Sequence, residues 1–184
     1  FGGLIGRLLD TVPNIDKARL SVHCHNDLGL AAANSLAALR AGADQVETTV
    51  NGIGERAGNA AFEEVVMALS TRDEYYGVEH NINARHIYRL SRLVSKYTGL
   101  EIPPCKAVVG DNAFRHQSGI HQHGVLRDRE TYEIISAESI GRYQVESMVL
   151  GKLSGLHAFR GQLQALGYYL DDDQYRAIFA KFKT

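Results

Sequence analysis

Two histidines, His23 and His25, stand two residues apart at the end of a short apolar run. Side chains of a β-strand alternate between two faces, so these histidines share one face with Ser21, while Val22 and Cys24 share the other. Two imidazoles about one pleat apart on one face can bind a single divalent cation. The spacing therefore favours a metal site.

The place of the pair along the chain supports this interpretation. Asn26 and Asp27 open a predicted helix, which puts the histidines at the carboxyl end of their strand. In parallel α/β architectures the catalytic groups gather at that end. The alternative is structural, because a single histidine in a strand is more often a hydrogen-bonded residue than a ligand. The presence of two on one face shifts the balance towards metal.

A glycine-rich loop, residues 51–59, follows a second apolar run and precedes a predicted helix. Its glycines and free N–H groups could accept a phosphate or a thioester carbonyl. A glycine-rich loop is a weak signal when taken alone, since many are only tight turns. The residues expected to contact a cofactor are Asn51, Gly52, Gly54 and Glu55.

Two residues of this loop have structural alternatives. Asn59 could supply a carbonyl ligand at the same rim as the two histidines, or it could cap the following helix. Glu55 and Arg56 could form a structural ion pair. On the second predicted strand the polar residues Gln45, Glu47 and Thr49 share one face, which we expect to lie beside the histidines.

The second half of the chain holds a further group of histidines, at positions 116, 121 and 123. His116 and His123 fit solvated surface residues. His121 lies in a segment with little apolar periodicity, where a functional role is plausible but spacing does not demonstrate it. Tyr132 could be an ordinary packing residue.

The elements that must position these groups alternate along the first part of the chain. This order is typical of a parallel sheet with helical crossovers. Glycines mark the expected helix ends, as Gly42 does for the second helix. The pattern predicts helices over about 1–11, 28–40 and 59–70, and strands over about 19–24 and 45–50.

After Arg72 the pattern becomes helical, and no further central strand is predicted. Gly99 should end the first of these helices, and Ser154 and Gly167 should cap the third. The expected helices cover about 84–98, 112–121, 156–166 and 172–182. We expect three parts: the carboxyl-terminal part of a barrel (1–72), a linker with a first helical subdomain (73–105), and a second helical lid subdomain (106–184).

Composition excludes several classes of protein. Apolar residues make up 45% and charged residues 22% of the chain, as in soluble globular proteins. A net charge of −1 gives no bulk attraction to nucleic acid or to a membrane surface. The only cysteines, Cys24 and Cys105, form no CxxC pair, which favours a reducing, cytoplasmic compartment. No apolar stretch approaches the ~20 residues that cross a bilayer, and no signal peptide is visible.

The sequence also indicates a piece of a longer protein. It begins at Phe1 inside an apparent helix, and two strands cannot make an independent parallel sheet. We expect the other strands of a closed barrel to precede Phe1. The chain by itself should then be inactive and poorly stable, with an unpaired edge and an uncovered apolar face on the strand at 19–24.

Three ordered motifs resemble those of the 2-isopropylmalate synthase family. They are His23-Cys24-His25-Asn26-Asp27-Leu28-Gly29, the whole loop from Asn51 to Asn59, and Ser118-Gly119-Ile120-His121-Gln122. This family is part of a superfamily of metal-dependent TIM-barrel lyases and synthases, which includes homocitrate and citramalate synthases. The resemblance covers practically the whole chain, and the three motifs together are very specific.

The resemblance implies a (β/α)8 TIM barrel followed by helical subdomains, in a homodimer whose helices cover the partner's barrel mouth. His23, His25 and Asn59 match the family's metal ligands, and the fourth is an aspartate from the first barrel strand, which this sequence does not contain. His121 matches a lid histidine of acid–base chemistry, and Tyr132 matches a lid tyrosine. The sequence departs from the family at His123, where aspartate is usual, and at Leu153, where a polar or basic residue is usual.

The activity implied is condensation of acetyl-CoA with 2-oxoisovalerate to give 2-isopropylmalate, aided by one divalent ion (Mn, Zn or Mg). A 2-oxo acid can chelate such an ion, which polarises its ketone, while a base removes a methyl proton from acetyl-CoA. The alternatives are homocitrate or citramalate synthase, which differ in the keto acid, and a non-catalytic truncated fragment.

Overall fold

The computed structural model describes residues 1–115, 134–143, 150–151 and 154–184. It divides into two compact units, the first made of residues 1–113 with 138–142 and the second of 114–137 with 143–184. Among the described residues, no helix is both long and apolar enough to cross a membrane. Each unit is described by itself.

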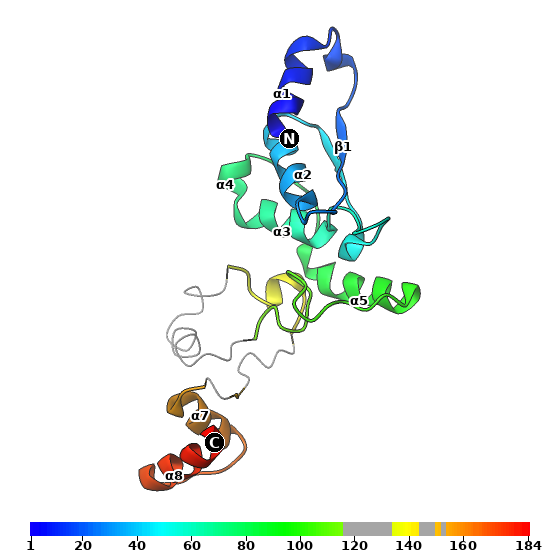
Figure 1. Ribbon diagram of the computed structural model, residues 1–184. Coiled ribbons are helices and arrows are strands. Elements are labelled where there is room, and N and C mark those ends of the chain that lie inside the picture. Colours follow the sequence, from blue (N-terminus) through cyan, green and yellow to red (C-terminus); the bar gives the residue numbers. More distant parts are fainter. Residues whose placement is uncertain (116–133, 144–149, 152–153) are drawn as a thin grey trace. The chain divides into compact units, whose positions relative to one another are not determined.

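The first unit begins with alternating helices and strands, as the sequence predicts (Figure 1). Its two strands are parallel and pair Ser21 with Gln45, Val22 with Val46, and His23 with Glu47. The elements in chain order are α1 (Gly2–Thr11), β1 (Ser21–His23), α2 (Ala31–Arg40), β2 (Gln45–Glu47) and α3 (Phe62–Thr71).

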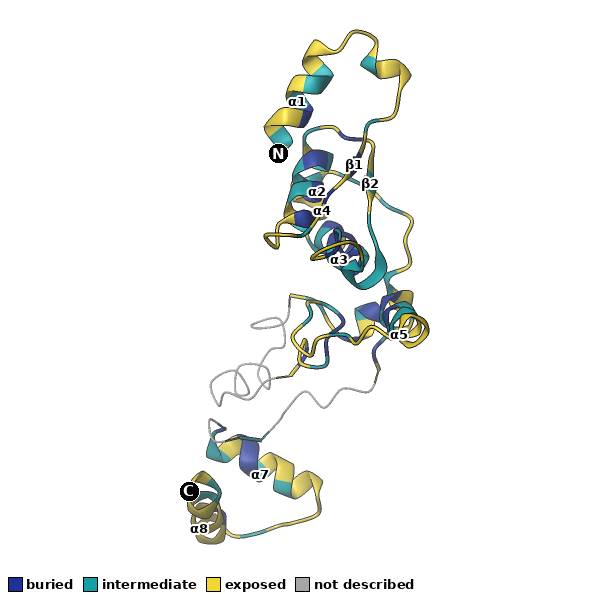
Figure 2. Ribbon diagram, turned by 45° about the vertical axis from the view of Figure 1, so that its right-hand side comes forward, coloured by how far each residue is buried: buried dark blue, intermediate teal, exposed yellow. Residues whose placement is uncertain are grey.

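The two faces of β1 differ sharply in burial. Val22 and Cys24 are each only 6% exposed, while Ser21, His23 and His25 are exposed. Val22 packs in a cluster with residues of α1 and α2, and Cys24 packs in a second cluster with residues of α2 and α3. Buried residues on α2 and α3 appear dark blue in Figure 2. The expectation of an uncovered apolar face was wrong, because helices cover that face.

Helix α2 ends at a glycine, as predicted. Gly42 has a φ of 104°, and the N–H groups of Gly42 and Ala43 donate to the carbonyls of Leu39 and Ala38. This paired arrangement satisfies the last carbonyls of the helix. The positive φ favours glycine there, and a Cβ would also require the end of the Leu9 side chain, 2.8 Å away, to shift.

Two helix starts were predicted too early. Helix α2 begins at Ala31 rather than 28, because residues 27–29 form a turn in which the side-chain oxygen of Asn26 accepts the N–H of Ala31. Helix α3 begins at Phe62 rather than 59, with Ala61 at its N-cap position and no side-chain cap. Asn59 is therefore not the helix cap.

A short helix, α4 (Asp73–Tyr76), follows α3 and was not predicted. The predicted helix at 84–98 is present as a 3-10 turn, Ala84–His86, that continues into α5 (Ile87–Thr98). The side chain of Asn83 accepts the N–H of Arg85, and Gly99 ends α5 with a φ of 72°. Ile87 and Ser91 are the buried residues of α5.

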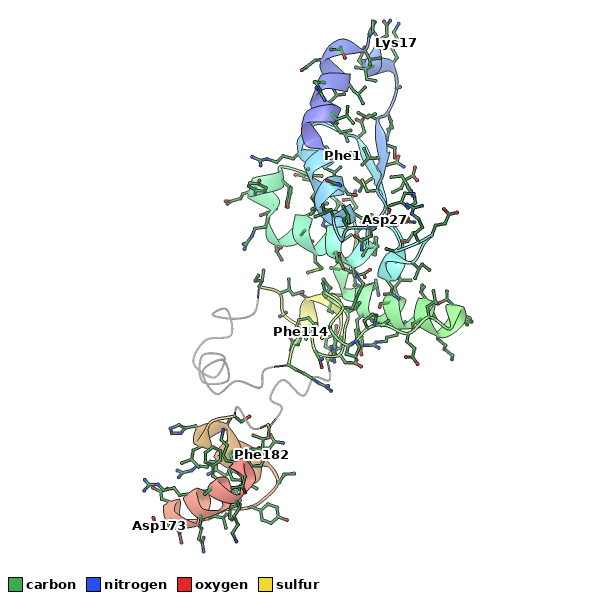
Figure 3. The ribbon with its side chains drawn as sticks, viewed as in Figure 1. Phe1, Lys17, Asp27, Phe114, Asp173 and Phe182 are labelled. Atoms are coloured by element: carbon green, nitrogen blue, oxygen red, sulfur yellow. The ribbon has the colours of Figure 1, made fainter. Side chains whose placement is uncertain are left out.

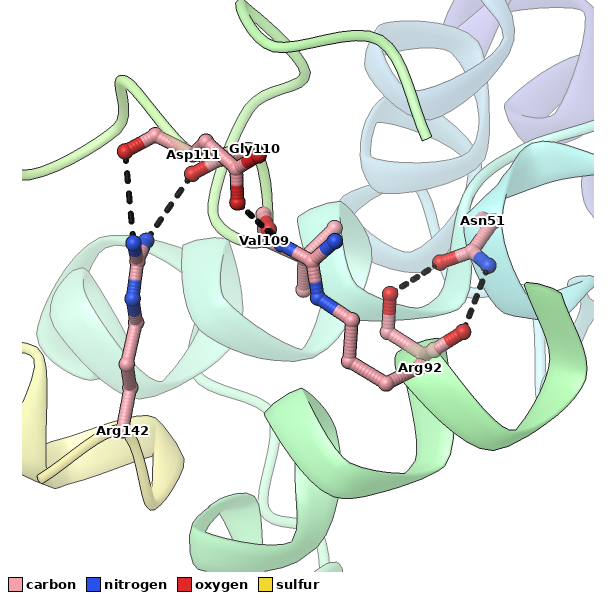
Figure 4. Close-up of polar contacts among 7 residues, drawn as sticks. Asn51, Arg92, Val109, Gly110, Asp111 and Arg142 are labelled. Atoms are coloured by element: carbon pink, nitrogen blue, oxygen red, sulfur yellow. Dashed lines mark hydrogen bonds and ion pairs between the residues drawn. The ribbon is translucent and has the colours of Figure 1, made fainter. Parts of the chain in front are cut away.

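Two arginines hold the turns after α5 (Figure 4). Arg92 donates to the Val109 carbonyl and the Asp111 carboxylate, at 3.1 and 2.7 Å. Arg142, only 6% exposed, donates to the carbonyls of Gly110 and Asp111. Residues 111–114 form a turn rather than the predicted start of a helix, and the rest of that prediction lies outside the described residues.

The second unit is a helical pair, α7 (Leu156–Ala165) and α8 (Asp172–Lys183). Three aromatic rings pack between them, those of Phe159, Phe179 and Phe182, the last labelled in Figure 3. Gly167 ends α7 as predicted, with a φ of 87°. Ser154 does not cap α7: Gly155 holds that position, and the Ser154 hydroxyl accepts the N–H of Gly151.

Candidate functional site

His23 and His25 lie together on the exposed face at the end of β1. Their ring centroids are 4.9 Å apart, and the ring planes meet at 71°. Parallel pairing places Glu47 of β2 directly beside His23, and Nδ1 of His23 lies 3.1 Å from Oε2 of Glu47. A carboxylate at one ring nitrogen fixes the orientation of an imidazole and makes its other nitrogen a better ligand. The Nε2 of His23 is the nitrogen left for that role.

Asn59 reaches the same place from the glycine loop. It forms an isolated antiparallel bridge with His25, supported by hydrogen bonds from Asn26 N–H to the Gly58 carbonyl and from Ala60 N–H to the Cys24 carbonyl. The backbone thus holds Asn59 beside the second histidine. The sequence predicted that the residues meet, but not the bridge that brings them together.

Asn59 is half-buried, and its side-chain oxygen is a buried atom. Its Oδ1 has no hydrogen-bond partner within the described part of the chain. A Cβ added at Gly54 would lie 2.6 Å from Asn59 Nδ2, so this glycine is needed to leave room for the amide. A buried carbonyl oxygen without a partner is costly, and a cation would satisfy it.

The three side chains form an incomplete donor set. Among the residues that the structure describes, no group of three or more histidine, cysteine, aspartate or glutamate side chains could hold a metal ion. Two imidazoles and one amide oxygen suit a divalent ion that accepts nitrogen and oxygen ligands. The residues present therefore fit such an ion, with at least one further ligand required.

The glycine loop folds back on itself next to the histidines. Gly58 has a φ of 91°, and a Cβ there would lie 2.0 Å from the Gly52 carbonyl oxygen, so only glycine allows this approach. The Gly52 carbonyl accepts the N–H of Asn59 at 3.0 Å. Of the residues expected to contact a cofactor, Gly54 and Glu55 are exposed, Gly52 is half-buried, and Asn51 makes side-chain contacts to α5.

A clamp between Asp27 and Arg56 joins the histidine segment to the glycine loop. Nε and Nη2 of Arg56 donate to the two carboxylate oxygens of Asp27, at 2.9 and 3.0 Å (Asp27 is labelled in Figure 3). The hydrogen bond from Arg56 lowers the pKa of the Asp27 carboxyl, and the same bond raises the pKa of the Arg56 guanidinium. Such bidentate pairs are geometrically specific.

Sequence reasoning missed this clamp. The ion pair offered as an alternative, between Arg56 and its neighbour Glu55, is present at 3.8 Å, but the closer partner of Arg56 is Asp27. Asp27 and Arg56 are far apart along the chain, and both lie in turns whose course local patterns do not determine. The aspartate was visible in the histidine motif, but no spacing rule links it to the loop.

The candidate functional residues of the predicted lid are not among the described ones. His116, His121, His123, Tyr132 and Leu153 all lie outside the described residues. Their roles stay predictions.

Comparison with protein families accounts for both parts of the chain. Residues 1–94, just over half of it, match the HMGL-like family, and residues 108–184 match the family described as the homocitrate synthase post-HMGL domain-like family. The chain belongs to the HMGL-like family.

Individual relatives with high identity to the chain are named 2-isopropylmalate synthases. The chain is 60% identical over 183 residues to a 2-isopropylmalate synthase of Ruminiclostridium cellulolyticum and 58% identical over 183 residues to that of Pyrococcus furiosus. It is 57% identical over 183 residues to 2-isopropylmalate synthase 1 of Caldanaerobacter subterraneus subsp. tengcongensis. All of the chain is covered in each case, but it spans only 36% of the first two relatives and 46% of the third. The resemblance seen in the sequence motifs is confirmed.

Proposed function

We propose that this chain is the carboxyl-terminal part of the catalytic region of a 2-isopropylmalate synthase, which condenses acetyl-CoA with 2-oxoisovalerate in leucine biosynthesis. The observation that carries the proposal is the pair of adjacent imidazoles at the carboxyl end of a parallel strand, with the backbone of Asn59 bridged to His25 and the Oδ1 of Asn59 without a hydrogen-bond partner among the described residues. The identity to proteins named 2-isopropylmalate synthase gives the particular reaction.

In this proposal, His23, His25 and Asn59 hold one divalent ion, Mn, Zn or Mg, and Glu47 orients the His23 ring. The ion, when bound, polarises the keto group of the 2-oxo acid. The backbone bridge joins His25 to Asn59, strand pairing and Glu47 hold His23, and the Asp27–Arg56 clamp joins the two segments, so the donor residues are arranged before the ion binds. Such preorganisation lowers the cost of binding.

The reaction also needs groups for the acetyl donor. The acetyl methyl loses a proton, its carbon joins the keto carbon, and water cleaves the thioester to release CoA and a carboxylate. We assign acid–base roles to His121 and Tyr132 by resemblance to the family. Gly54 and Glu55 lie in the exposed part of the loop, where N–H groups can receive the acetyl-CoA carbonyl or phosphates, whereas Gly52 is half-buried and its N–H donates to the Thr49 carbonyl.

The proposal extends to organisation and assembly. Residues 1–72 complete a TIM barrel, residues 73–105 form a linker with the first helical subdomain, and residues 106–184 form a lid. Two copies form a homodimer with crossed lids. The partners are small molecules in the cytoplasm, with neither nucleic acid nor membrane involved.

A second candidate function differs only in the keto acid. The description of the family that matches residues 108–184 favours a homocitrate-type substrate, 2-oxoglutarate, and citramalate synthase chemistry would use pyruvate. The His23, His25 and Asn59 site is compatible with all three, because it would bind the ion and not the keto-acid side chain.

The test is release of CoA thiol by the full-length protein that contains this chain, with acetyl-CoA and each of the three keto acids. We expect kcat/KM to be highest with 2-oxoisovalerate and turnover to vanish after chelation of divalent ions. A preference for 2-oxoglutarate or pyruvate would transfer the assignment to the second candidate. Turnover with none of the three would support the non-catalytic reading.

A further inference from the structure

Asn51, at the start of the glycine loop, has an unusual backbone conformation and a hydrogen-bonded side chain. Its φ of 62° and ψ of 6° lie in the left-handed region, which asparagine tolerates better than most residues. Its Nδ2 donates to the Ser91 carbonyl at 3.0 Å, and its Oδ1 accepts the Ser91 hydroxyl, as Figure 4 shows. The amide thus makes one donor and one acceptor contact to Ser91, and both orient it towards α5.

Ser91, the partner of this amide, is a buried residue of α5. Ser91 is completely buried in the middle of α5 and is 0% exposed. Both of its contacts to Asn51 therefore join α5 to the segment of alternating strands and helices, residues 1–72. A buried hydrogen-bonded pair of this kind fixes the distance between two elements.

The backbone N–H of Asn51 is held from a second direction. It donates at 3.0 Å to Oε2 of Glu63, a residue of α3 that is only 1% exposed. The other carboxylate oxygen of Glu63 lies 3.1 Å from Nζ of Lys106, which also pairs with Glu64. The buried charge is therefore compensated by a lysine from the turns after α5.

Only one residue separates this anchored position from the candidate site. Gly52 follows Asn51, and its carbonyl accepts the N–H of Asn59. Gly58 packs against the same carbonyl, so the two ends of the loop are in direct contact. A shift of Asn51 changes the position of the Gly52 carbonyl and hence that of Asn59.

We propose that Asn51 and Ser91 are positioning residues that make α5 part of the framework of the Asn59 site. The expected effect of the Asn51–Ser91 contact on metal binding rests on the proposed function. The expected effect of that contact on the loop is independent of the proposed function. The inference assigns Asn51 a role in holding the loop and not in contacting acetyl-CoA. The helices after the barrel would then influence the metal site within their own chain, in addition to any action on a partner.

The test compares Ser91→Ala with Ser95→Ala in the full-length protein. Ser95 lies one turn further along α5, and its hydroxyl donates to the Leu100 carbonyl instead of to the loop. The two variants thus lose the same group from the same helix. Hydrogen exchange of the amides at 52–60 and the Kd for Mn²⁺ are measured in both.

We expect Ser91→Ala to speed exchange in residues 52–60 and to weaken Mn²⁺ binding about three- to tenfold, as the loss of a typical hydrogen bond would. Ser95→Ala should change neither the exchange rates nor the Mn²⁺ affinity. The difference between the two variants should persist even if their melting temperatures are equal. Parent-like exchange and Mn²⁺ affinity in a folded Ser91→Ala protein would overturn the proposal.

Asn51→Gly covers the case in which Ser91→Ala does not fold. Glycine adopts a positive φ without strain, so this variant keeps the turn and removes only the contacts to Ser91. The expected results are the same faster exchange and weaker Mn²⁺ binding, and a loop identical to the parent overturns the inference. If the parent protein binds no Mn²⁺, the proposed function fails while hydrogen exchange still decides whether α5 holds the loop.

Discussion

At the scale of single residues, the imidazoles of His23 and His25 are the groups on which the proposed chemistry depends. We predict that replacing either with alanine weakens Mn²⁺ binding by at least about tenfold in the full-length protein, because a direct ligand is lost. His80→Ala is the matched control, since that ring contacts the Ser70 hydroxyl away from the site. Metal content is measured after dialysis. A His23→Ala, His25→Ala double variant with parental metal content would reject the assignment.

Glu47 should act through His23. Glu47→Gln keeps the shape of the side chain but removes the charge that holds Nδ1 of His23. We predict a loss of about tenfold in Mn²⁺ affinity, at the lower end of the effect of a partner behind a metal ligand. Gln45→Ala, two residues earlier on the same exposed face, should have no effect. Calorimetric titration with Mn²⁺ separates the two, and equal affinities would remove Glu47 from the site.

The residues of the site could be predicted from the sequence to different degrees. Alternation along one strand sufficed to place His23 and His25 together on one face and Val22 on the other, but it did not predict that helices cover the Val22 face. The role of Asn51 was not foreseeable, because its partners Ser91 and Glu63 reach it from two other helices. Contacts of that kind depend on how elements pack, and no local pattern records them.

At the scale of elements, Lys106 joins the turns after α5 to the buried carboxylate on α3. Its side chain is 16% exposed and that of Glu63 is 1% exposed. We predict that Lys106→Ala lowers the free energy of unfolding by about 3 kcal/mol at pH 7, because it leaves Glu63 buried without its counter-charge. Lys96→Ala, on the exposed surface of α5, should change it little. Chemical denaturation of the full-length variants measures both, and equal stability would contradict the buried-pair argument.

The same pair gives a pH dependence with a definite sign. Burial, the largest influence, would lower the pKa of the Lys106 ammonium, but Glu64 and Glu63 together outweigh it and raise that pKa above its usual value. A lysine whose pKa is raised on folding stabilises the folded state. This contribution is complete at pH values below the pKa in the unfolded chain, about 10.4, and it is lost as pH rises through the higher pKa of the folded state. The alkaline loss of stability should therefore be smaller in Lys106→Ala than in the parent.

Element types followed from the sequence better than element ends did. The helix ends at Gly42, Gly99 and Gly167 were predicted correctly, because a positive φ after a helix is a local preference of glycine. The start of α3 was placed three residues early, at Asn59 rather than Phe62, because Asn59 pairs with His25 of another segment. A tertiary contact overrode the local capping preference.

At the scale of the whole molecule, the described sheet has only two strands, β1 and β2. Two strands are only part of a barrel sheet, and the donor set of the proposed metal site is incomplete among the described residues. We predict that the purified chain of 184 residues releases no thiol from acetyl-CoA and 2-oxoisovalerate above background. A full-length relative at equal concentration is the positive control. A comparable rate from the chain alone would disprove the need for the rest of the barrel.

In the proposed homodimer with crossed lids, each active site would combine residues of two copies of the chain. If His121 acts on a neighbouring copy, His121→Ala should lower kcat far more than it weakens keto-acid binding, because a proton-transfer group acts mainly in the transition state. His23→Ala should also be inactive, through loss of a metal ligand. In a mixed dimer one composite site combines the intact His23 of one copy with the intact His121 of the other.

Mixing the two inactive variants under conditions of subunit exchange should therefore restore activity. With random exchange half of the dimers are mixed and each contains one intact site of two, so recovery should approach about a quarter of the parental rate per subunit. Exchange is followed independently with differently tagged copies, and His80→Ala in place of His121→Ala shows the activity expected when only one variant is defective. If the tags exchange and the His121→Ala mixture stays inactive, each site is built within one chain, and His121 acts beside its own His23.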